Sequence, residues 1–159
     1  TPKTSSAASD VYKRQTETFL LYASRKHLDQ NLLKPSLAAK KFVICDRYYD
    51  ATEAYQCYGK GLSHDFFKSL NNVCNLSIPE ITFYIDITSE ISKERISNRE
   101  RDRMEAEEID FFNKVREGYL KIAEENRERI FKINGIDTIE NIHKRILEHV
   151  GEKIGSSLG

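Results

Sequence analysis

The stretch ITFYIDI, residues 81–87, decides the fold class of this chain. It follows Pro79, is short for a helix, and consists mainly of β-branched and aromatic residues, which favours a strand. The run FVIC at 42–45 is apolar throughout, a pattern typical of a strand that is buried on both faces of a parallel sheet. A weaker third strand is predicted at 130–133.

Helical periodicity fills the segments between these runs, which predicts an α/β fold with a parallel sheet. The first helix is predicted over 16–33, with Pro35 as its end. Four more are predicted after 63, after 88, over 109–122 and over 139–150. The residues that indicate them are Leu21, Leu28 and Leu32; Ser63 as a cap with Phe66, Phe67, Leu70 and Val73; Thr88 or Ser89 as a cap; Ile109, Phe112, Val115, Tyr119 and Ile122; and Ile139, Ile142, Ile146 and Val150.

Length and composition indicate one soluble globular domain. The 159 residues are 39% hydrophobic and 31% charged, so the chain is long enough to bury a core without disulfides or metals. Residues 1–15, TPKTSSAASDVYKRQ, follow neither a helical nor a strand period, and we expect an unordered or non-native leader. Residues 151–159 hold three glycines and two serines, so we expect a flexible tail and a folded domain over 16–150.

Charge and cysteine content argue against several classes of function. The chain has 25 Lys and Arg and 25 Asp and Glu, and this balance disfavours a nucleic-acid partner. The three cysteines lack the spacing of zinc or redox sites, so we single out no metal ligands and expect a cytoplasmic compartment. We find neither a run of apolar residues long enough to span a membrane nor a signal peptide.

Asp46 and Arg47 follow the predicted strand at 42–45, at the sheet edge where parallel folds bind ligands. An arginine fixed there can bind a phosphate through two N–H groups, with Asp46 holding the arginine or a metal. A surface ion pair in a loop fits the spacing equally well. The motif alone leaves both interpretations open.

Arg25 lies on the apolar face of the first predicted helix, four residues after Leu21 and three before Leu28. A charge on a face that packs against a sheet needs an acceptor or a route to water. The side chain can extend along its apolar stem to solvent, or it can bind a polar ligand at the sheet edge. The first of these is the more common arrangement.

The stretch KERISNRERDRME, residues 93–105, carries four arginines between two predicted helices. Mixed charge of this kind is typical of a solvated helix face with ion pairs four residues apart. The alternative is a lid whose arginines close over phosphate groups during phosphoryl transfer. Taken alone, the stretch favours the solvated face.

Together these motifs resemble the thymidylate kinase family. The stretch ICDRYYDATEAYQ at 44–56 is similar to the family signature, and LLYASR at 20–25 and DRME at 102–105 match in family order, as do the later Phe111-Phe112 and Tyr119-Leu120. The resemblance covers roughly residues 16–147. It implies a P-loop NTPase-like parallel sheet flanked by helices, transfer of the ATP γ-phosphoryl group to dTMP with Mg²⁺, and a homodimer paired through helices such as the one carrying Phe66 and Phe67. A core role for these two phenylalanines fits the sequence at least as well.

The resemblance also implies roles for individual residues. Arg47 holds the dTMP phosphate, Asp46 orients Arg47 or a metal-bound water, and Arg25 binds a thymine carbonyl. The base pocket is lined by Thr52 and Gln56, and Tyr55 lies where a ribose 2′-hydroxyl would be. Residues 93–105 form the lid, and those expected to reach the ATP phosphates are Arg95, Arg99, Arg101 and Arg103, the last three also being catalytic candidates.

Three features depart from the family pattern. Ala51 stands where a serine is usual, and Leu21 takes the place of an aromatic residue that stacks on thymine. The lid lacks its common glycine. The first two differences leave room for a kinase of another pyrimidine monophosphate, and the third leaves open which arginine reaches the ATP phosphates.

The largest departure is that these residues contain no G-x-x-x-x-G-K-[ST] stretch, which binds ATP phosphates in P-loop kinases. We therefore expect the C-terminal two thirds of a thymidylate kinase, an incomplete sheet that lacks the first two strands, and no activity from these residues alone. A nucleotide-binding relative without catalysis is the third hypothesis.

Overall fold

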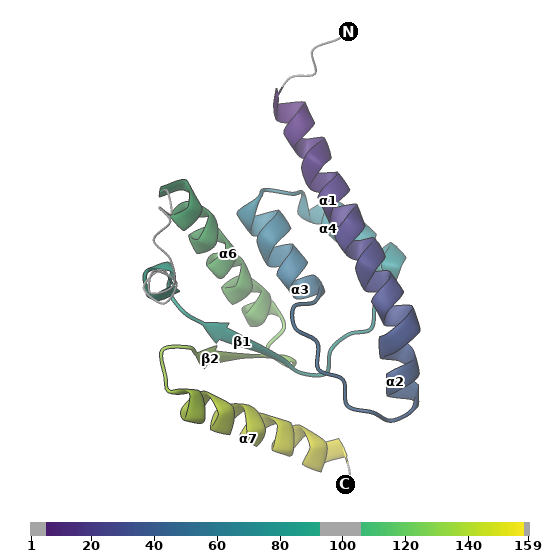
Figure 1. Ribbon diagram of the computed structural model, residues 1–159, viewed down its shortest axis with the longest axis vertical. Helices are drawn as coiled ribbons and strands as arrows, with labels where there is room; N and C mark the ends of the chain where they lie inside the picture. The colour runs from purple at the N-terminus through teal and green to yellow at the C-terminus, as the bar shows by residue number, and fades with distance from the viewer. Residues whose placement is uncertain (1–5, 93–105, 158–159) are drawn as a thin grey trace. The chain divides into compact units, whose positions relative to one another are not determined.

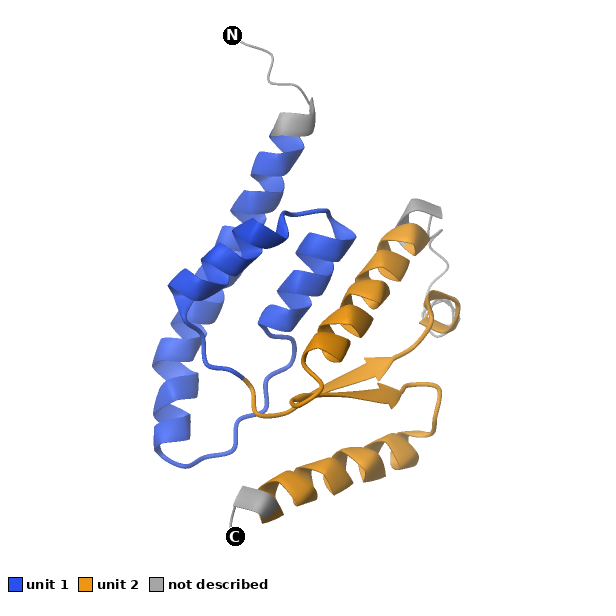
Figure 2. Ribbon diagram, turned by 180° about the vertical axis from the view of Figure 1, so that it is seen from behind, with its two compact units in different colours: residues 1–78 blue, residues 79–159 orange. Residues whose placement is uncertain are grey.

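The computed structural model describes residues 6–92 and 106–157 and divides into two compact units (Figures 1 and 2). Unit 1 covers 1–78 and unit 2 covers 79–159, and each is described by itself. The prediction of a single domain over 16–150 stays a prediction. No helix in the described ranges is long and apolar enough to cross a membrane.

Unit 1 is built from helices. A first helix, α1 (Ser6–Leu28), continues through the π-helical turn η1 (Asp29–Leu33) into α2 (Lys34–Ala38). After a connecting segment come α3 (Tyr49–Thr52) and a second π-helical turn, η2 (Glu53–Gly59), and then α4 (His64–Cys74). The predicted cap of α4 is confirmed, because the Ser63 side chain accepts a hydrogen bond from the Phe66 N–H.

The first helix differs from its prediction at both ends. Residues 6–15, expected to be an unordered leader, form the first turns of α1. Pro35 does not end the helical path, since it lies in the first turn of α2, directly after the π-helical turn. The π-helical turn η1 adds a residue to the path and shifts the buried face, so Leu33 is buried while Leu32 is 53% exposed.

The core of unit 1 lies where α1, η2 and α4 meet. Tyr22 of α1 is fully buried, and its ring packs edge-on against Phe67 of α4 at 6.0 Å between centroids. Phe67 is therefore a core residue, and Phe66 beside it is half-buried against Phe19. The buried core residues are Tyr22, Leu33, Tyr48, Tyr49, Cys57, Leu62, Phe67 and Leu76.

The predicted strand at 42–45 is wrong. The segment has no regular secondary structure, and the side chains of Phe42 and Ile44 are 83% and 98% exposed. A strand forms only when a neighbouring strand binds its backbone N–H and C=O groups. The sheet within the described residues consists of β1 (Thr82–Asp86) and β2 (Ile130–Asn134), and neither pairs with this segment.

Unit 2 confirms the other two predicted strands. β1 and β2 run parallel, with Thr82 opposite Ile130 and Asp86 opposite Asn134. Between them lie the helical residues 89–92 and α6 (Ala106–Glu125). The cap of the first of these is Thr88, whose Oγ1 accepts a hydrogen bond from the Ile91 N–H at 3.5 Å. This is a small α/β unit of the kind predicted from the alternation of strands and helices.

Two helices cover opposite faces of this strand pair (Figure 1). Tyr84 of β1 stacks on Tyr119 of α6, with ring centroids 4.8 Å apart. Its neighbour Phe83 points to the other face, where the His149 ring of α7 (Ile139–Ser157) packs against Phe83 and Phe131. The predicted face of α7 is half-buried except at Ile139, and the helix continues to Ser157, where a flexible tail was expected.

Gly135 allows β1 and β2 to end close together. Its N–H donates to the Asp86 carbonyl at 2.8 Å, and a Cβ at this position would lie 2.5 Å from Ile87 Cγ2 and 2.8 Å from Ile85 Cγ2. The branched side chains of both isoleucines are attached close to the backbone and have little freedom to move away.

We predict that Gly135→Ala lowers the free energy of unfolding by about 1–3 kcal/mol, because the added methyl group overpacks this turn. The matched control is Gly151→Ala in α7, where an added Cβ meets nothing within 4 Å. That change removes a glycine from a helix and is expected to stabilise by about 0.5–1 kcal/mol. Urea unfolding measures both, and equal effects would contradict the packing argument.

Candidate active site

The candidate site in unit 1 begins at Arg47, whose backbone is in the left-handed region at φ 58°. A non-glycine residue is uncommon there, and such strain costs of order 1–3 kcal/mol and persists only where the surrounding structure imposes it. The Arg47 guanidinium carbon lies over the Tyr55 ring, 5.4 Å from its centroid. The structure thus brings together two of the predicted site residues, Arg47 and Tyr55. Asp46, which precedes Arg47 in the chain, is exposed.

Two further predicted residues are buried in the helical segments that follow Arg47. Thr52 is 2% exposed and Gln56 is 3% exposed, and they lie on consecutive helical segments, α3 and η2. In the described part of the chain, Thr52 Oγ1, Gln56 Oε1 and the Tyr48 hydroxyl find no hydrogen-bond partner. A buried polar atom left without a partner costs about 1–3 kcal/mol, and such groups are therefore uncommon outside ligand sites.

Arg25 of α1 is half-buried and lies close to the segment that carries Asp46 and Arg47. Burial raises the pKa of the Cys45 thiol and of the Tyr48 hydroxyl, and the positive charge of Arg25 acts in the opposite direction on both. The structure therefore places Arg25, from the motif at 20–25, close to Cys45 and Tyr48 of the motif at 44–56. Leu21, on the same helix, is half-buried.

Asp29 is a polar residue of this region that the sequence analysis missed. Its side chain is fully buried, accepts a hydrogen bond from the Ser77 N–H at 3.0 Å, and lies 3.1 Å from Lys34 Nζ. Burial raises the pKa of Asp29, but the hydrogen bond from Ser77 and the charge of Lys34 outweigh it and hold the pKa below its usual value. Its position four residues after Arg25 was the available sequence signal.

Residues of α1 also fix the end of η2. Arg14 Nη1 donates to the Lys60 carbonyl at 2.6 Å, and Lys60 Nζ binds both carboxylate oxygens of Glu17, at 2.7 and 2.6 Å. The chain then turns at Gly61, whose φ of 70° suits glycine. The part of α1 that includes Arg14 therefore helps to hold the helical segment bearing Tyr55 and Gln56.

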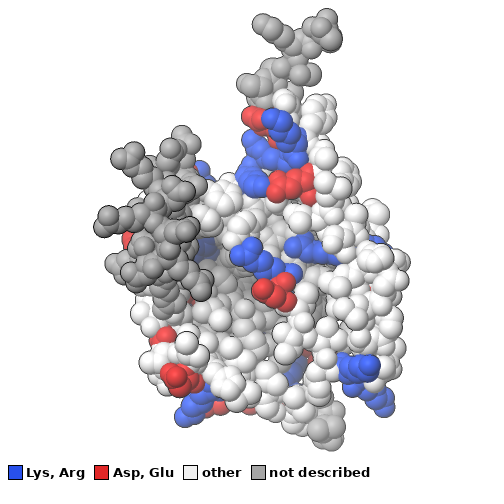
Figure 3. Space-filling model, in the orientation of Figure 1, with Lys and Arg blue, Asp and Glu red and all other residues white. Residues whose placement is uncertain are grey.

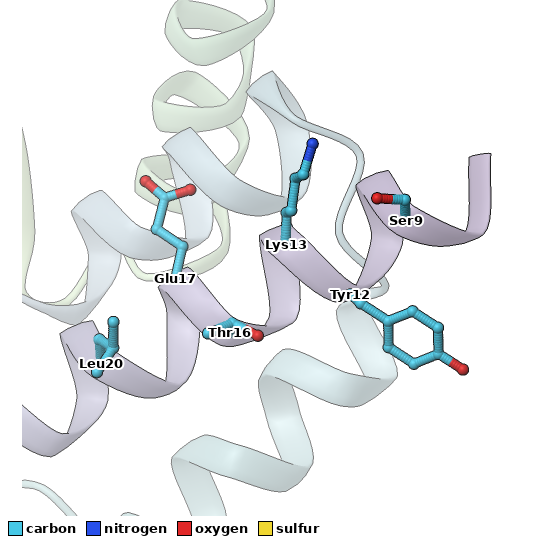
Figure 4. Close-up of a pocket in the computed structure, with 6 residues that line it drawn as sticks. All are labelled: Ser9, Tyr12, Lys13, Thr16, Glu17 and Leu20. Atoms are coloured by element: carbon cyan, nitrogen blue, oxygen red, sulfur yellow. The ribbon is translucent and has the colours of Figure 1, made fainter. Parts of the chain in front are cut away.

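An open groove of about 530 Å³ lies along α1 (Figure 4). Its lining residues all come from this one helix: Ser9, Tyr12, Lys13, Thr16, Glu17 and Leu20. None of them is a predicted site residue, and the polar groups come from a single helix face. The groove is therefore separate from the candidate site around Arg47.

Unit 2 holds a second polar cluster, at the carboxyl end of β1, that sequence reasoning also missed. Arg116 of α6 binds Asp86 through two hydrogen bonds, Nε to Oδ1 at 2.7 Å and Nη2 to Oδ2 at 2.9 Å, and the Tyr84 hydroxyl donates to Oδ1 at 3.0 Å. Burial raises the pKa of Asp86, and the hydrogen bonds from Arg116 and Tyr84 outweigh it, so the pKa lies below its usual value. A carboxylate at the end of an apolar strand was the sequence signal.

The predicted lid lies outside the described residues, and with it Arg95, Arg99, Arg101 and Arg103. Across 6–92 and 106–157, no group of three or more His, Cys, Asp or Glu side chains gathers as a metal site. One face of the molecule shows lysine and arginine interspersed with aspartate and glutamate (Figure 3), in line with the balanced charge of the sequence.

Comparison with solved structures gives the class of this protein. A crystal structure of thymidylate kinase from Ehrlichia chaffeensis matches 87% of this chain and 65% of that chain, with a TM-score of 0.70 and 30% sequence identity. This likeness shows a P-loop NTPase-like α/β fold, with which the parallel strand pair and its flanking helices agree.

Sequence comparison gives the family. The thymidylate kinase family model matches residues 5–146. Proteins named thymidylate kinase from a Sulfurihydrogenibium species and from Acinetobacter baylyi are 42% and 39% identical over 136 residues, which is 84% and 85% of this chain and 66% and 67% of theirs. The chain belongs to the thymidylate kinase family and spans about two thirds of the length of these relatives. The resemblance drawn from the three motifs is confirmed.

We predict that Asp29→Asn destabilises the chain by about 1–2 kcal/mol at pH 7, because hydrogen bonds to a charged group are stronger than those to an amide. The folded pKa of Asp29 is below its unfolded value, so this stabilisation is present above about pH 4 and is lost as the pH falls through the folded pKa. The difference between the two proteins should therefore shrink with acidification.

Chemical unfolding between pH 7 and pH 3 measures this difference. Asp10→Asn is the control, because Asp10 forms an exposed ion pair with Lys13 at 3.8 Å and its loss should change stability by less than about 1 kcal/mol. An Asp29→Asn difference that stays constant across this range would contradict the role of the buried charge.

Proposed function

We propose that the whole protein transfers the γ-phosphoryl group of ATP to dTMP and forms dTDP. The observation that carries this proposal is the set of buried polar atoms without partners on Tyr48, Thr52 and Gln56, directly after the exposed Arg47. A nucleoside monophosphate has a matching layout, since its charged phosphate and its hydrogen-bonding base lie at opposite ends. Membership of the thymidylate kinase family selects dTMP among such ligands.

In this proposal the phosphate end of dTMP binds at the Asp46-Arg47 pair. The guanidinium of Arg47 donates two parallel hydrogen bonds to the phosphate, a geometry that lysine cannot reproduce. Asp46 orients Arg47 or a metal-bound water. A single carboxylate such as Asp46 is enough for Mg²⁺, because this ion usually binds one or two protein carboxylates and takes its other ligands from phosphate and water.

The nucleoside end binds deeper in unit 1. Thr52 and Gln56 supply the hydrogen-bonding groups that meet the base, and Arg25 binds a thymine carbonyl. Leu21 covers one face of the base with an aliphatic side chain. The Tyr55 ring lies against the sugar at its 2′ carbon and leaves no room for a hydroxyl.

ATP and Mg²⁺ complete the reaction in this proposal. The lid arginines, Arg95, Arg99, Arg101 and Arg103, neutralise charge on the transferring phosphoryl group. The 159 residues contain no G-x-x-x-x-G-K-[ST] stretch, and we expect these residues on their own to bind dTMP but to form no dTDP. A coupled assay with ATP and dTMP that detects turnover would overturn this expectation.

The assembly and location are part of the same proposal. We expect the whole protein to act in the cytoplasm, where ATP and dTMP meet, and to form a homodimer through its helices. Phe66, half-buried on α4, remains a candidate for that surface, whereas the buried Phe67 does not. Sedimentation of the whole protein tests the dimer.

Calorimetric titration of the 159-residue chain tests the substrate. We expect dTMP to bind more tightly than thymidine, dUMP or dAMP. Tighter binding of dUMP would favour a kinase of another pyrimidine monophosphate. The buried Ala51 leaves room for this alternative, because it lacks the hydroxyl that the usual serine would place there. Binding of dTMP with no phosphorylation by the whole protein would favour a non-catalytic relative.

We predict that Arg47→Lys weakens dTMP binding by about tenfold or more, because the bidentate contact is lost although the charge is kept. Thymidine, which has no phosphate, should bind both proteins alike. Lys41→Arg is the control for a charge exchange at an exposed position in the same segment, and it should leave both affinities unchanged. Equal dTMP affinity in wild type and Arg47→Lys would remove Arg47 from the site.

We predict that Tyr55→Ala narrows the preference for thymidine over ribothymidine by about tenfold, because it opens space beside the 2′ carbon. Using the nucleosides keeps the phosphate contact out of this comparison. Titration with both ligands, together with the melting temperature of the variant, measures the effect. An unchanged preference would show that Tyr55 does not meet the sugar.

A further inference from the structure

The contact between Arg47 and Tyr55 points to a second role for Tyr55, in addition to its proposed contact with the sugar. Arg47 is exposed and has a left-handed backbone, so its long side chain would otherwise sample many rotamers. Instead its guanidinium carbon lies over the Tyr55 ring, 5.4 Å from the centroid. The ring contact therefore restricts the positions that the guanidinium can take.

We propose that Tyr55 is a positioning residue for Arg47: its ring holds the guanidinium where the substrate phosphate is bound. This inference rests on the proposed function of Arg47. An aromatic face attracts the guanidinium through its π electrons and uses none of the N–H donors. Those donors stay available for a phosphate, so the ring contact and the phosphate contact can exist together.

The surroundings of Tyr55 make its ring a fixed support. Tyr55 lies in η2 and is half-buried between the buried Ala54 and Gln56. The end of η2 is held to α1 by the hydrogen bond from Arg14 to the Lys60 carbonyl and by the Lys60–Glu17 ion pair. The Arg47 side chain thus rests on a ring whose helical segment is held to α1 at its end, and less side-chain entropy is lost when the phosphate binds.

The experiment measures the contribution of the phosphate as the ratio of the thymidine dissociation constant to the dTMP dissociation constant. Tyr55→Leu removes the aromatic face, and we expect this ratio to fall about two- to fivefold, the effect of an exposed cation–π contact. Tyr55→Phe keeps the face and should keep the ratio. A role confined to the sugar would change both dissociation constants equally and leave the ratio unchanged.

Two controls connect the effect to Arg47. Tyr58→Leu replaces another tyrosine of η2, whose ring contacts His64 at 4.8 Å between centroids, and should leave the ratio unchanged. In an Arg47→Gln background, Tyr55→Leu should no longer alter the ratio, because the cation is absent. A full effect of Tyr55→Leu in that background would overturn the proposal.

A measurement without ligand completes the test. In the free chain, the Arg47 Nε–H proton resonance should lie upfield because of the ring, should move downfield in Tyr55→Leu, and should stay in place in Tyr55→Phe. An identical resonance in all three proteins would overturn the proposal, whatever the affinities. Absence of dTMP binding in the unsubstituted chain would overturn the proposed function as well, whereas tight dTMP binding with an unchanged ratio in Tyr55→Leu would overturn the positioning role alone.

Discussion

The buried carboxylate of Asp29 is the interaction on which the architecture of unit 1 depends. It lies in the π-helical turn that ends α1, and it accepts a hydrogen bond from Ser77, in the segment that follows α4. The end of α1 is thereby joined to the segment after α4 by one charged group that water does not reach. A buried charge is favourable only when its partners are in place, so this contact also fixes the path of α1 relative to α4. The contact between Tyr22 of α1 and Phe67 of α4 joins the same two helices.

The candidate site draws on the stability that this core provides. Arg47 has a strained backbone, and three buried polar atoms nearby are without partners in the described residues. Each of these features is unfavourable in the free protein, and a folded state tolerates them only because the surrounding contacts outweigh them. A ligand with hydrogen-bonding groups would remove the part of this cost that comes from the unpaired polar atoms. Residues that are unfavourable in the free protein, such as Thr52 and Gln56, are thus also residues that would bind the ligand.

The sequence predicted those parts of the fold that depend on local pattern. The strands β1 and β2 follow from short apolar runs, and α4 from its serine cap and apolar spacing. The segment at 42–45 has the same composition as a strand, but pairing is a property of two segments, and composition cannot show whether a partner is present. The π-helical turn η1 was not predictable either, since one extra residue in a turn leaves no periodic signal while it moves burial from Leu32 to Leu33.

The candidate site was predictable to the extent that motifs list its residues, and the structure adds how they cooperate. The motif at 44–56 names Arg47 and Tyr55 but says nothing about contact between them. That contact arises because Arg47 turns in the left-handed region just before α3, while Tyr55 follows in the π-helical turn η2. Neither conformation is encoded by a residue type that prefers it, since Arg47 is not a glycine and Glu53–Gly59 has the spacing of an ordinary helix. The signature is therefore better understood as a backbone path that brings two separated side chains together than as a row of independent ligand contacts.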